Sequence, residues 1–219
     1  MTSYYTPVAS LPPLPRQFDA GPIPVTAASL RRRVTMLDIE HQQVVRQLGD
    51  FFRWDRQPQE RSDAEVRVTY RRLTAAIRNP LVTHIVHHRF EMRTLVAAIR
   101  HQRGGLPPPD LPELPLSIDI RRNWDQPRFR LDARFSWLPP FCQALDENRP
   151  KRAKWHLFSE LWNHWSRLDE AYYFTFESFV LYLARWEILR RWVSQDATRG
   201  QQRFGDLVDN ILQSGGAHI

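Results

Sequence analysis

The sequence is poor in glycine and lacks the common motifs of catalysis. With eight glycines in 219 residues, it contains no G-x-x-x-x-G-K-[ST] and no G-x-G-x-x-G, the loops that cradle nucleotide phosphates. No C-x-x-C, H-E-x-x-H or G-x-S-x-G occurs either. These absences argue against the familiar nucleotide, redox, metallopeptidase and hydrolase sites. We expect a chain without catalytic residues and without a cofactor.

Cysteine is also scarce, and no segment has the composition of a membrane span. The single cysteine, Cys142, cannot form an internal disulfide, which is typical of a reducing compartment. The most apolar long window, residues 174–193, carries charged side chains along its length, which are costly in a bilayer. The opening MTSYYTPVASLPPL has no basic residue and is interrupted by prolines, unlike a signal peptide. We therefore expect a soluble, cytoplasmic chain.

The charge is positive and carried almost entirely by arginine. The net charge is +7, and of 31 Lys and Arg residues only Lys151 and Lys154 are lysines. Such a balance suits an acidic or phosphate-bearing partner. The arginine bias is explained either by planar recognition at interfaces or by a GC-rich genome. Arginine clusters are scattered and not interleaved with aromatic residues, unlike a nucleic-acid groove. A basic helical module that binds nucleic acid stays open as the alternative function.

Apolar residues recur at helical spacing along most of the chain. No segment alternates with the period of two that marks a strand. The pattern predicts an all-α bundle of about seven helices, with Asp38 capping the first of them. The expected ranges are 37–52, 63–79, 81–102, 135–146, 150–168, 174–194 and 201–213.

Proline divides the chain. The stretch GGLPPPDLPELPL begins at Gly104, which together with Gly105 is expected to end the preceding helix, and its five prolines exclude a helix interior. We expect an extended connector over 104–118 between an N-terminal half, 1–103, and a C-terminal half, 119–219, of one compact unit. Pro80 should end or kink the helix before it. Residues 1–28 should be mostly irregular, with residues 4–11 docking on the helices through Tyr4, Tyr5, Val8 and Leu11.

Three side chains form a candidate metal site. On a helix, His84, His88 and Glu91 are spaced i, i+4 and i+7, so they could share one flank as zinc ligands do. However, His88 also falls within the apolar stripe of this helix, where a histidine that packs in the core is commoner. We predict no metal and keep the three residues as candidates.

Glu187 lies on a helix that is apolar almost all round. A carboxylate in such a position needs a partner, because an unpaired buried charge is strongly destabilising. Arg190 and Arg191 follow at i+3 and i+4, within reach on the helix surface. Two cations would keep the carboxylate ionised, which is a poor state for a general acid. We predict a structural ion pair of Glu187 with Arg190 and Arg191.

Two segments together resemble a known family. YYTPVASLPPL at the start and FTFESFVLYLARWEILRRW at 174–192 resemble a bacterial family of unassigned function encoded beside the genes of V-type ATPases. The second segment also resembles the stalk subunits of V/A-type ATPases that are designated C or d, and FEMRTLVAAIR at 90–100 is a weaker match. Thr6-Pro7 departs from the usual aromatic-leucine pair, and the chain is shorter than typical C-type stalk subunits. The matching positions are Tyr4, Tyr5, Ser10, Leu11, Phe176, Glu177, Tyr182, Leu183, Arg185, Glu187, Ile188 and Arg191.

The resemblance implies a function without catalysis. The C-type stalk subunits resemble a socket on the cytoplasmic face of the rotor ring that receives the central shaft. The expectation is a central-stalk adaptor that couples the ring to the shaft in proton or sodium transport. Its partners would be the rotor-ring and central-shaft subunits, and its place would be peripheral on the cytoplasmic face of the inner membrane.

Overall fold

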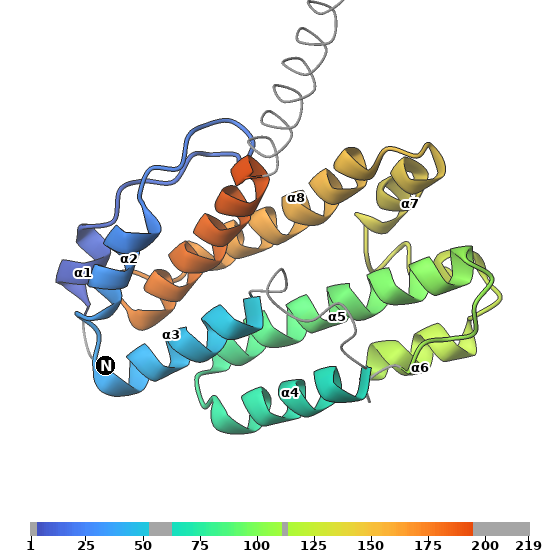
Figure 1. Cartoon of the computed structure of the whole chain (residues 1–219), viewed down its shortest axis with the longest axis horizontal. Coiled ribbons are helices and arrows are strands. Elements are labelled where there is room, and N and C mark those ends of the chain that lie inside the picture. The colour runs from blue at the N-terminus through green and yellow to red at the C-terminus, as the bar shows by residue number, and fades with distance from the viewer. Residues whose placement is uncertain (1–3, 53–62, 111–113, 195–219) are drawn as a thin grey trace, which may run out of the picture. The chain divides into compact units, whose positions relative to one another are not determined.

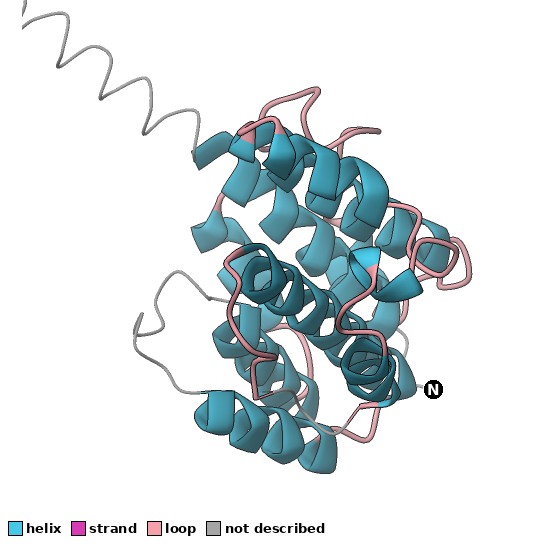
Figure 2. Cartoon of the chain, turned by 90° about the vertical axis from the view of Figure 1, so that its right-hand side faces the viewer, coloured by secondary structure: helices cyan, strands magenta, loops and turns pink. Residues whose placement is uncertain are grey.

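The computed structural model describes residues 4–52, 63–110 and 114–194, which form helices joined by loops (Figures 1 and 2). No strand occurs in these ranges, and the predicted all-α class is confirmed. Among the described helices, none combines the length and apolar character that a bilayer span requires. The predicted helix over 201–213 lies outside the described residues.

The chain divides into two compact units that are not successive in sequence. Unit 1 joins Met1–Arg31 to Leu161–Ile219, and unit 2 is Arg32–Glu160. This division differs from the two halves predicted on either side of residues 104–118. The reason is that residues beyond the proline-rich stretch pack back on the helix before it. Gln102 Nε2, for example, donates to the carbonyl oxygens of Trp124 (2.6 Å) and Gln126 (3.1 Å).

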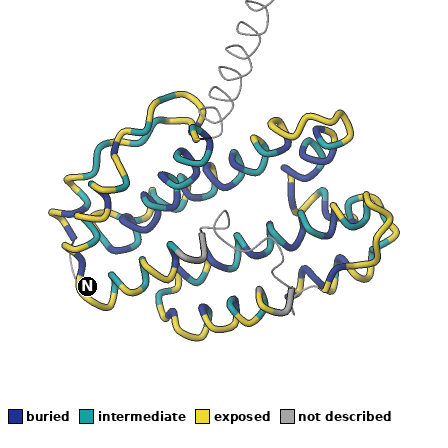
Figure 3. The backbone as a smooth tube through the Cα atoms, in the orientation of Figure 1, coloured by how far each residue is buried: buried dark blue, intermediate teal, exposed yellow. Residues whose placement is uncertain are grey.

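Unit 2 is organised around one long helix, α5 (Pro80–Arg103). Both α4 (Asp63–Ala76) and α6 (Pro115–Arg122) pack against it. Buried residues recur along the whole length of α5 (Figure 3). Its completely buried side chains are Val82, Ile85, Val86, Leu95 and Ala98. The unit also holds α3 (Ile39–Phe52), α7 (Leu138–Asp146) and the first half of α8 (Pro150–Asp169).

Local side chains decide where these helices begin and end. The backbone N–H of His41 donates to Asp38 Oδ1 (2.8 Å), so Asp38 caps α3 as predicted. At the other end of α5, the N–H of Gly104 donates to the carbonyl of Arg100 (3.0 Å), and Gly105 has φ +64°. A glycine accepts this left-handed conformation without steric cost, which is why the helix stops there.

Prolines stand at the first position of several helices, and Pro80 and Pro115 were the two at which a helix boundary or a connector was predicted. Pro80 is the first residue of α5, after Asn79, whose side-chain oxygen accepts from the N–H of Val82 (3.1 Å). Pro115 likewise begins α6 inside the predicted connector, so the extended stretch is shorter than 104–118. Proline is favoured at the first helical position because the missing N–H has no helical partner there.

The helix before Pro80 ends at Ala76, three residues short of the predicted boundary at 79. The residue before a proline is biased away from the helical conformation. The chain therefore leaves the helix early enough to place Asn79 in the extended conformation of a cap.

Unit 1 contains a helix hairpin and the N-terminal segment, residues 4–31, which packs against it. The last part of α8 and the helix over 176–194 form the hairpin. Short helices α1 (Tyr5–Ala9) and α2 (Ala27–Val34), which begin in this segment, lie beside the helix 176–194 (Figure 1). That helix begins after Thr175, later than the predicted residue 174. Thr175 and Ser178 cap it reciprocally, each backbone N–H donating to the other hydroxyl (3.1 and 3.4 Å).

Candidate functional site

The two segments that carry the family resemblance pack against each other in unit 1. The backbone N–H of Tyr4 donates to the carbonyl of Phe174 (2.8 Å). The Tyr182 hydroxyl donates to the carbonyl of Pro12 (2.8 Å), across 170 positions of sequence. A buried tyrosine requires a partner for its hydroxyl, and a carbonyl outside a helix lacks the partner that a helix would supply. Each segment therefore satisfies polar groups of the other.

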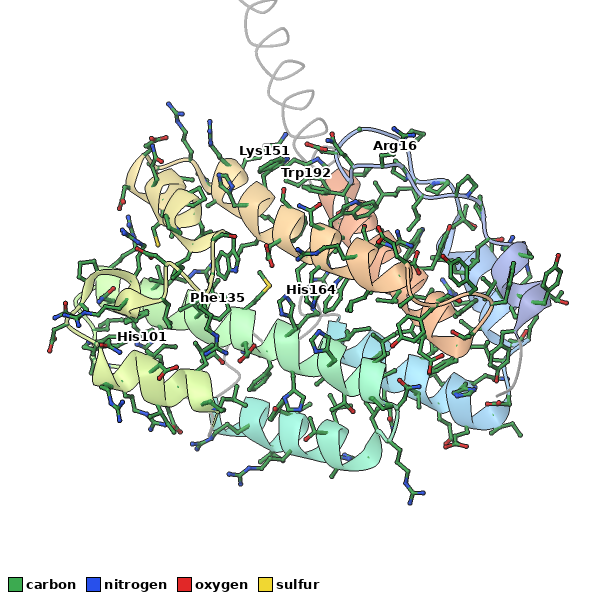
Figure 4. The ribbon with its side chains drawn as sticks, turned by 180° about the vertical axis from the view of Figure 1, so that it is seen from behind. Arg16, His101, Phe135, Lys151, His164 and Trp192 are labelled. Atoms are coloured by element: carbon green, nitrogen blue, oxygen red, sulfur yellow. The ribbon has the colours of Figure 1, made fainter. Side chains whose placement is uncertain are left out.

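Two tryptophans extend this pairing along the N-terminal segment. Trp162 Nε1 donates to the carbonyl of Arg16 (3.0 Å), and Trp186 Nε1 donates to the carbonyl of Val25 (2.9 Å). Figure 4 labels Arg16 on this segment and Trp192 on the helix 176–194. The irregular backbone is thus fixed by side-chain donors from the hairpin, in place of the regular bonds of a helix.

Phe18 fixes the same segment by apolar packing. Its side chain is only 3% exposed, and its ring lies 5.2 Å from that of Trp192, edge to face, and 6.1 Å from that of Trp162. Residues 4–31 therefore contribute buried side chains to the core of unit 1, although much of their backbone is irregular. A second buried cluster joins this segment to the helix 176–194, and its members are Val25, Leu30, Tyr182 and Trp186.

Glu187 is held by two arginines on its own helix. Arg190 donates from Nε to Oε2 (2.9 Å) and from Nη2 to Oε1 (2.8 Å), and Arg191 Nε donates to Oε1 (2.8 Å). The side chain of Glu187 is 13% exposed, and that of Arg191 is 19% exposed. The structure thus brings together the three residues predicted from their spacing. Their contribution to stability stays a prediction.

The electrostatics of Glu187 oppose a function as a proton donor. Burial alone would raise the pKa of its carboxyl, but the hydrogen bonds from Arg190 and Arg191, together with their charges, lower the pKa below its ordinary value. The carboxylate is therefore ionised at neutral pH, with both oxygens engaged. This geometry suits a structural element and offers no proton to a substrate.

Acid should erase the contribution of Glu187 to stability. Its pKa is lower in the folded protein than in the unfolded chain, so the pair stabilises fully above the ordinary pKa of 4.5. The stabilisation is lost as pH falls through the lower folded value. The difference in unfolding free energy between the unsubstituted chain and Glu187→Gln should therefore shrink below about pH 4.5. Urea unfolding over a pH series measures it, and a difference that stays constant into acid would contradict the direction of the shift.

Asp169 and Arg185 form a second ion pair, which the sequence pattern does not indicate. Arg185 Nη2 donates to Asp169 Oδ2, and the side chains of Asp169 and Arg185 are 28% and 16% exposed. Within the described part of the chain, Arg185 Nε finds no hydrogen-bond partner. Burial raises the pKa of Asp169, and the single arginine offsets only part of this effect. Burial dominates because one arginine serves Asp169, whereas two serve Glu187.

This contrast between the two pairs predicts different tolerance to neutral substitutions. Because the folded pKa of Asp169 is raised, its carboxyl favours the folded state in acid, and that contribution is lost as pH rises through the folded pKa. Asp169→Asn should cost less than about 1 kcal/mol at neutral pH, because burial already disfavours the ionised carboxylate and the amide oxygen can still accept from Arg185. Glu187→Gln, which removes a charge bonded to two arginines, should cost about 2 kcal/mol. Urea unfolding of the two variants compares them directly, and equal costs would contradict the distinction.

Most residues of the resemblance lie inside unit 1. Phe176 and Ile188 are buried, and Leu183 packs on the cluster of Tyr182 and Trp186. Three further positions of the resemblance are not in the core. Leu11 and Glu177 are half-buried, and Ser10 Oγ donates a hydrogen bond to the carbonyl of Pro7 (3.0 Å).

The expectation that Tyr5 packs on the helices is wrong: its side chain is 63% exposed at the surface of unit 1, with its ring 4.6 Å from that of Phe174. Tyr4, by contrast, is buried, as expected of a docking residue, and Pro7, which was not among the expected contacts, is buried too. The helical turn of α1 accounts for this difference. Side chains three positions apart, such as those of residues 4 and 7, point to the same side of a helix, whereas that of residue 5 points to another side.

The histidine-rich face of α5 does not assemble the candidate metal site. His84 is exposed, its ring stacking 6.2 Å from that of His88. Glu91 accepts a hydrogen bond from Arg134 Nη2 (3.0 Å). The ligand atoms of His84, His88 and Glu91 do not gather within 4.8 Å of one another. The helical spacing therefore places the three residues along one flank of α5, but their ligand atoms do not converge on a common point.

A different histidine on α5 has a specific partner. The hydroxyl of Tyr70 on α4 hydrogen-bonds Nδ1 of His87, and the Tyr70 ring stacks 4.2 Å from that of Phe90. Burial, assisted by the negative charge of Glu91, raises the pKa of Tyr70, so its hydroxyl stays protonated and can donate. This contact ties α4 to α5. The sequence offered no signal for it, because the two residues lie on different helices.

Comparisons of this chain with protein families, with curated proteins and with solved structures find no match.

Proposed function

We propose that this chain is a non-catalytic central-stalk adaptor of a bacterial V/A-type ATPase, similar to the C-type stalk subunits. In that role it would couple the membrane rotor ring to the central shaft in proton or sodium transport. It would lie peripherally on the cytoplasmic face of the inner membrane, with ring and shaft subunits as partners. The proposal goes beyond the all-α fold and rests on the resemblance of the two end segments.

The observation that carries the proposal is the packing of these two segments on each other. Residues separated by most of the chain meet through Tyr4 and Phe174 and through Pro12 and Tyr182. Their joint occurrence in the sequence thus has a structural reason, because each segment satisfies polar groups of the other. This supports treating them as one family signature and not as two unrelated similarities.

The chemistry of unit 1 is consistent with an adaptor. Two acidic residues that approach its interior, Glu187 and Asp169, are both paired with arginines of the same unit. Aromatic side chains fill the core, among them Phe18, Trp162 and Trp192. A part that transmits torque needs an interior that resists deformation, and closely packed aromatic side chains supply that property.

Co-purification tests the proposal. The tagged full-length chain, co-expressed with the ring and shaft subunits of a bacterial V/A-type ATPase, should elute with both sets of partners in mild detergent. The attachment should survive nuclease treatment, since the proposed contacts are between proteins. As a control, the tag fused to an unrelated basic helical protein of similar charge should recover neither partner.

Two results would count against the adaptor. Elution of the chain alone, in the presence of assembled ring and shaft, would contradict the proposal. Association that disappears with nuclease would instead favour the nucleic-acid module suggested by the net charge of +7. That alternative also predicts a steep salt dependence of binding to an oligonucleotide.

A further inference from the structure

The turn that joins the two helices of the unit 1 hairpin carries exposed aromatic side chains. Tyr173 is 75% exposed and Phe174 is 39% exposed. Tyr5, the first residue of α1, is 63% exposed, and its ring lies 4.6 Å from that of Phe174. We call Tyr5, Tyr173 and Phe174 the aromatic tip. Single exposed apolar side chains are common in proteins, but neighbouring ones often mark an interaction site.

Phe174 has a backbone conformation that is unfavourable for an aromatic residue. Its φ is +51°, in the left-handed region that glycine adopts without steric cost. The N–H of Tyr4 donates to the Phe174 carbonyl (2.8 Å) and holds the backbone in place. Because the ring is partly exposed, burial offsets only part of the cost. A phenylalanine at such a position favours a function of the ring outside the fold.

The segments that form the aromatic tip differ in charge from the rest of the chain. Residues 4–15 contain no charged side chain, and residues 168–176 contain two acidic residues and no cation. Asp169 is engaged in its ion pair within the unit, and Glu170 is exposed. Arg167, just before this stretch, lies in the last turn of α8, where a cation complements the helix dipole. In a protein of net charge +7, these segments are locally acidic.

Glu170 lies close to the aromatic tip because the chain turns between them. The N–H of Ala171 donates to the carbonyl of Leu168 (3.2 Å), and the N–H of Tyr172 donates to the carbonyl of Asp169 (3.1 Å). Three peptide bonds separate Glu170 from Tyr173, so their Cα atoms lie at most about 11 Å apart. An exposed carboxylate and exposed rings therefore share one end of the hairpin.

We propose that the aromatic tip and Glu170 bind a basic segment of a partner protein, with an arginine or lysine of that segment against the rings. The face of an aromatic ring is negative and attracts a cation, and a nearby carboxylate adds an ion pair. Arginine suits both contacts, because its planar guanidinium stacks on rings and donates to carboxylates. The local acidity supplies the charge complementarity that selects a basic partner.

Other occupants fit this surface less well. A stable dimer buries about 800 Å² on each partner, and three rings that are already partly buried supply roughly half of that area. A second copy would also bring two Glu170 carboxylates together. Glu170 would repel the phosphates of an anionic bilayer or of a nucleic acid, and the aromatic tip offers them no cation.

This inference goes beyond the adaptor proposal and does not depend on it. Tyr5 belongs to the family signature, but attraction of a cation is a property of the exposed rings in whatever complex the chain joins. Synthetic peptides therefore test the aromatic tip in the absence of all ATPase components, whereas co-purification tests the adaptor. Failure of either proposal leaves the other standing.

Fluorescence anisotropy with a labelled peptide provides the test. The probe is a nonapeptide in which arginines alternate with glycine and serine, and its control carries citrulline, the neutral analogue, in place of each arginine. Because the full-length chain is itself positively charged, its remaining surface repels the arginine peptide. At low ionic strength the chain should bind the arginine peptide roughly tenfold more tightly than the citrulline peptide.

Substitutions in the aromatic tip should weaken this binding without unfolding the protein. Glu170→Gln/Tyr173→Ala should reduce the affinity for the arginine peptide by roughly tenfold, through loss of a carboxylate and a ring. Both side chains are exposed, so the stability should not change. Phe174→Gly should reduce the affinity by roughly fivefold without loss of stability, because glycine accepts the positive φ.

A matched variant separates the aromatic tip from general effects of charge and exposed apolar surface. Ile39→Ala/Glu40→Gln removes a side chain that is also 75% exposed, together with the charge of an exposed glutamate. This variant should keep the affinity for the arginine peptide within about twofold. Equal losses in the two doubly substituted variants would overturn the proposal. So would equal binding of the arginine and citrulline peptides, or no binding of the arginine peptide by the full-length chain.

Discussion

Replacing Glu187 with alanine is expected to lower the free energy of unfolding by about 2–3 kcal/mol. The substitution leaves Arg190 and Arg191 beside each other without the carboxylate that now accepts three hydrogen bonds from them. Since Arg191 is only 19% exposed, water compensates it poorly. Urea denaturation at neutral pH, followed by tryptophan fluorescence, measures the loss.

Glu170→Ala is the matched control, because Glu170 is an exposed glutamate of the same unit. It should change the free energy of unfolding by no more than about 0.5 kcal/mol. If Glu187→Ala and Glu170→Ala unfold at the same urea concentration, the ion pair contributes nothing to the fold. That result would remove the structural interpretation of this buried carboxylate.

Phe18→Ala is expected to be at least as damaging, at about 3–4 kcal/mol. The ring is 3% exposed and contacts both Trp162 and Trp192, so its removal leaves a cavity between two large side chains. The sequence alone would not predict such a large loss, because Phe18 lies in a proline-rich stretch of the kind that often contributes little to stability. Thermal or urea unfolding, with limited proteolysis of the N-terminal segment, would report the effect.

Tyr173→Ala serves as the control for removal of an aromatic ring. Tyr173 belongs to the same unit but is 75% exposed, so its removal should alter stability by less than about 0.5 kcal/mol. Comparable stability of Phe18→Ala and Tyr173→Ala would mean that residues 4–31 contribute little to unit 1. Increased cleavage near residue 18 in Phe18→Ala alone would support the packing described.

Features that depend on short spacing were predictable from the sequence. The sequence predicts Asp38 as a cap because the capping bond spans three residues, and it predicts the end of α5 because Gly105 can adopt a positive φ. Glu187 and its arginines were grouped because their contacts lie within one helical turn. In each case the interacting residues lie within about one helical turn of each other in the sequence, so the sequence pattern alone can reveal the contact.

Contacts between distant residues had no such signal. Arg185 meets Asp169 across a turn between two helices, and Tyr182 meets Pro12 from the far end of the chain. Helical periodicity says which side chains face inward, but it does not say which other segment they will meet there. The pairing of the N-terminal segment with the hairpin therefore required the structure.

The start of α6 could not be predicted from the sequence, for a different reason. A proline disfavours the helical turn before it but permits the one after it, so the residue alone does not reveal whether a helix stops or starts. At Pro80 the neighbouring Asn79 supplies a capping oxygen that marks a start. At Pro115 the preceding residue, Leu114, makes no side-chain cap, and the sequence resembles one continuous extended stretch.

The discontinuity of unit 1 also constrains the order in which the protein can fold. During synthesis, residues 4–31 emerge before unit 2, whereas Tyr182, Trp186 and Trp192 emerge only after it. Closing a loop of this length costs entropy that the contacts must recover, so the pairing of the ends forms late. Unit 2 is continuous and can fold on the ribosome, while residues 4–31 remain unpaired until the helix 176–194 has been synthesised.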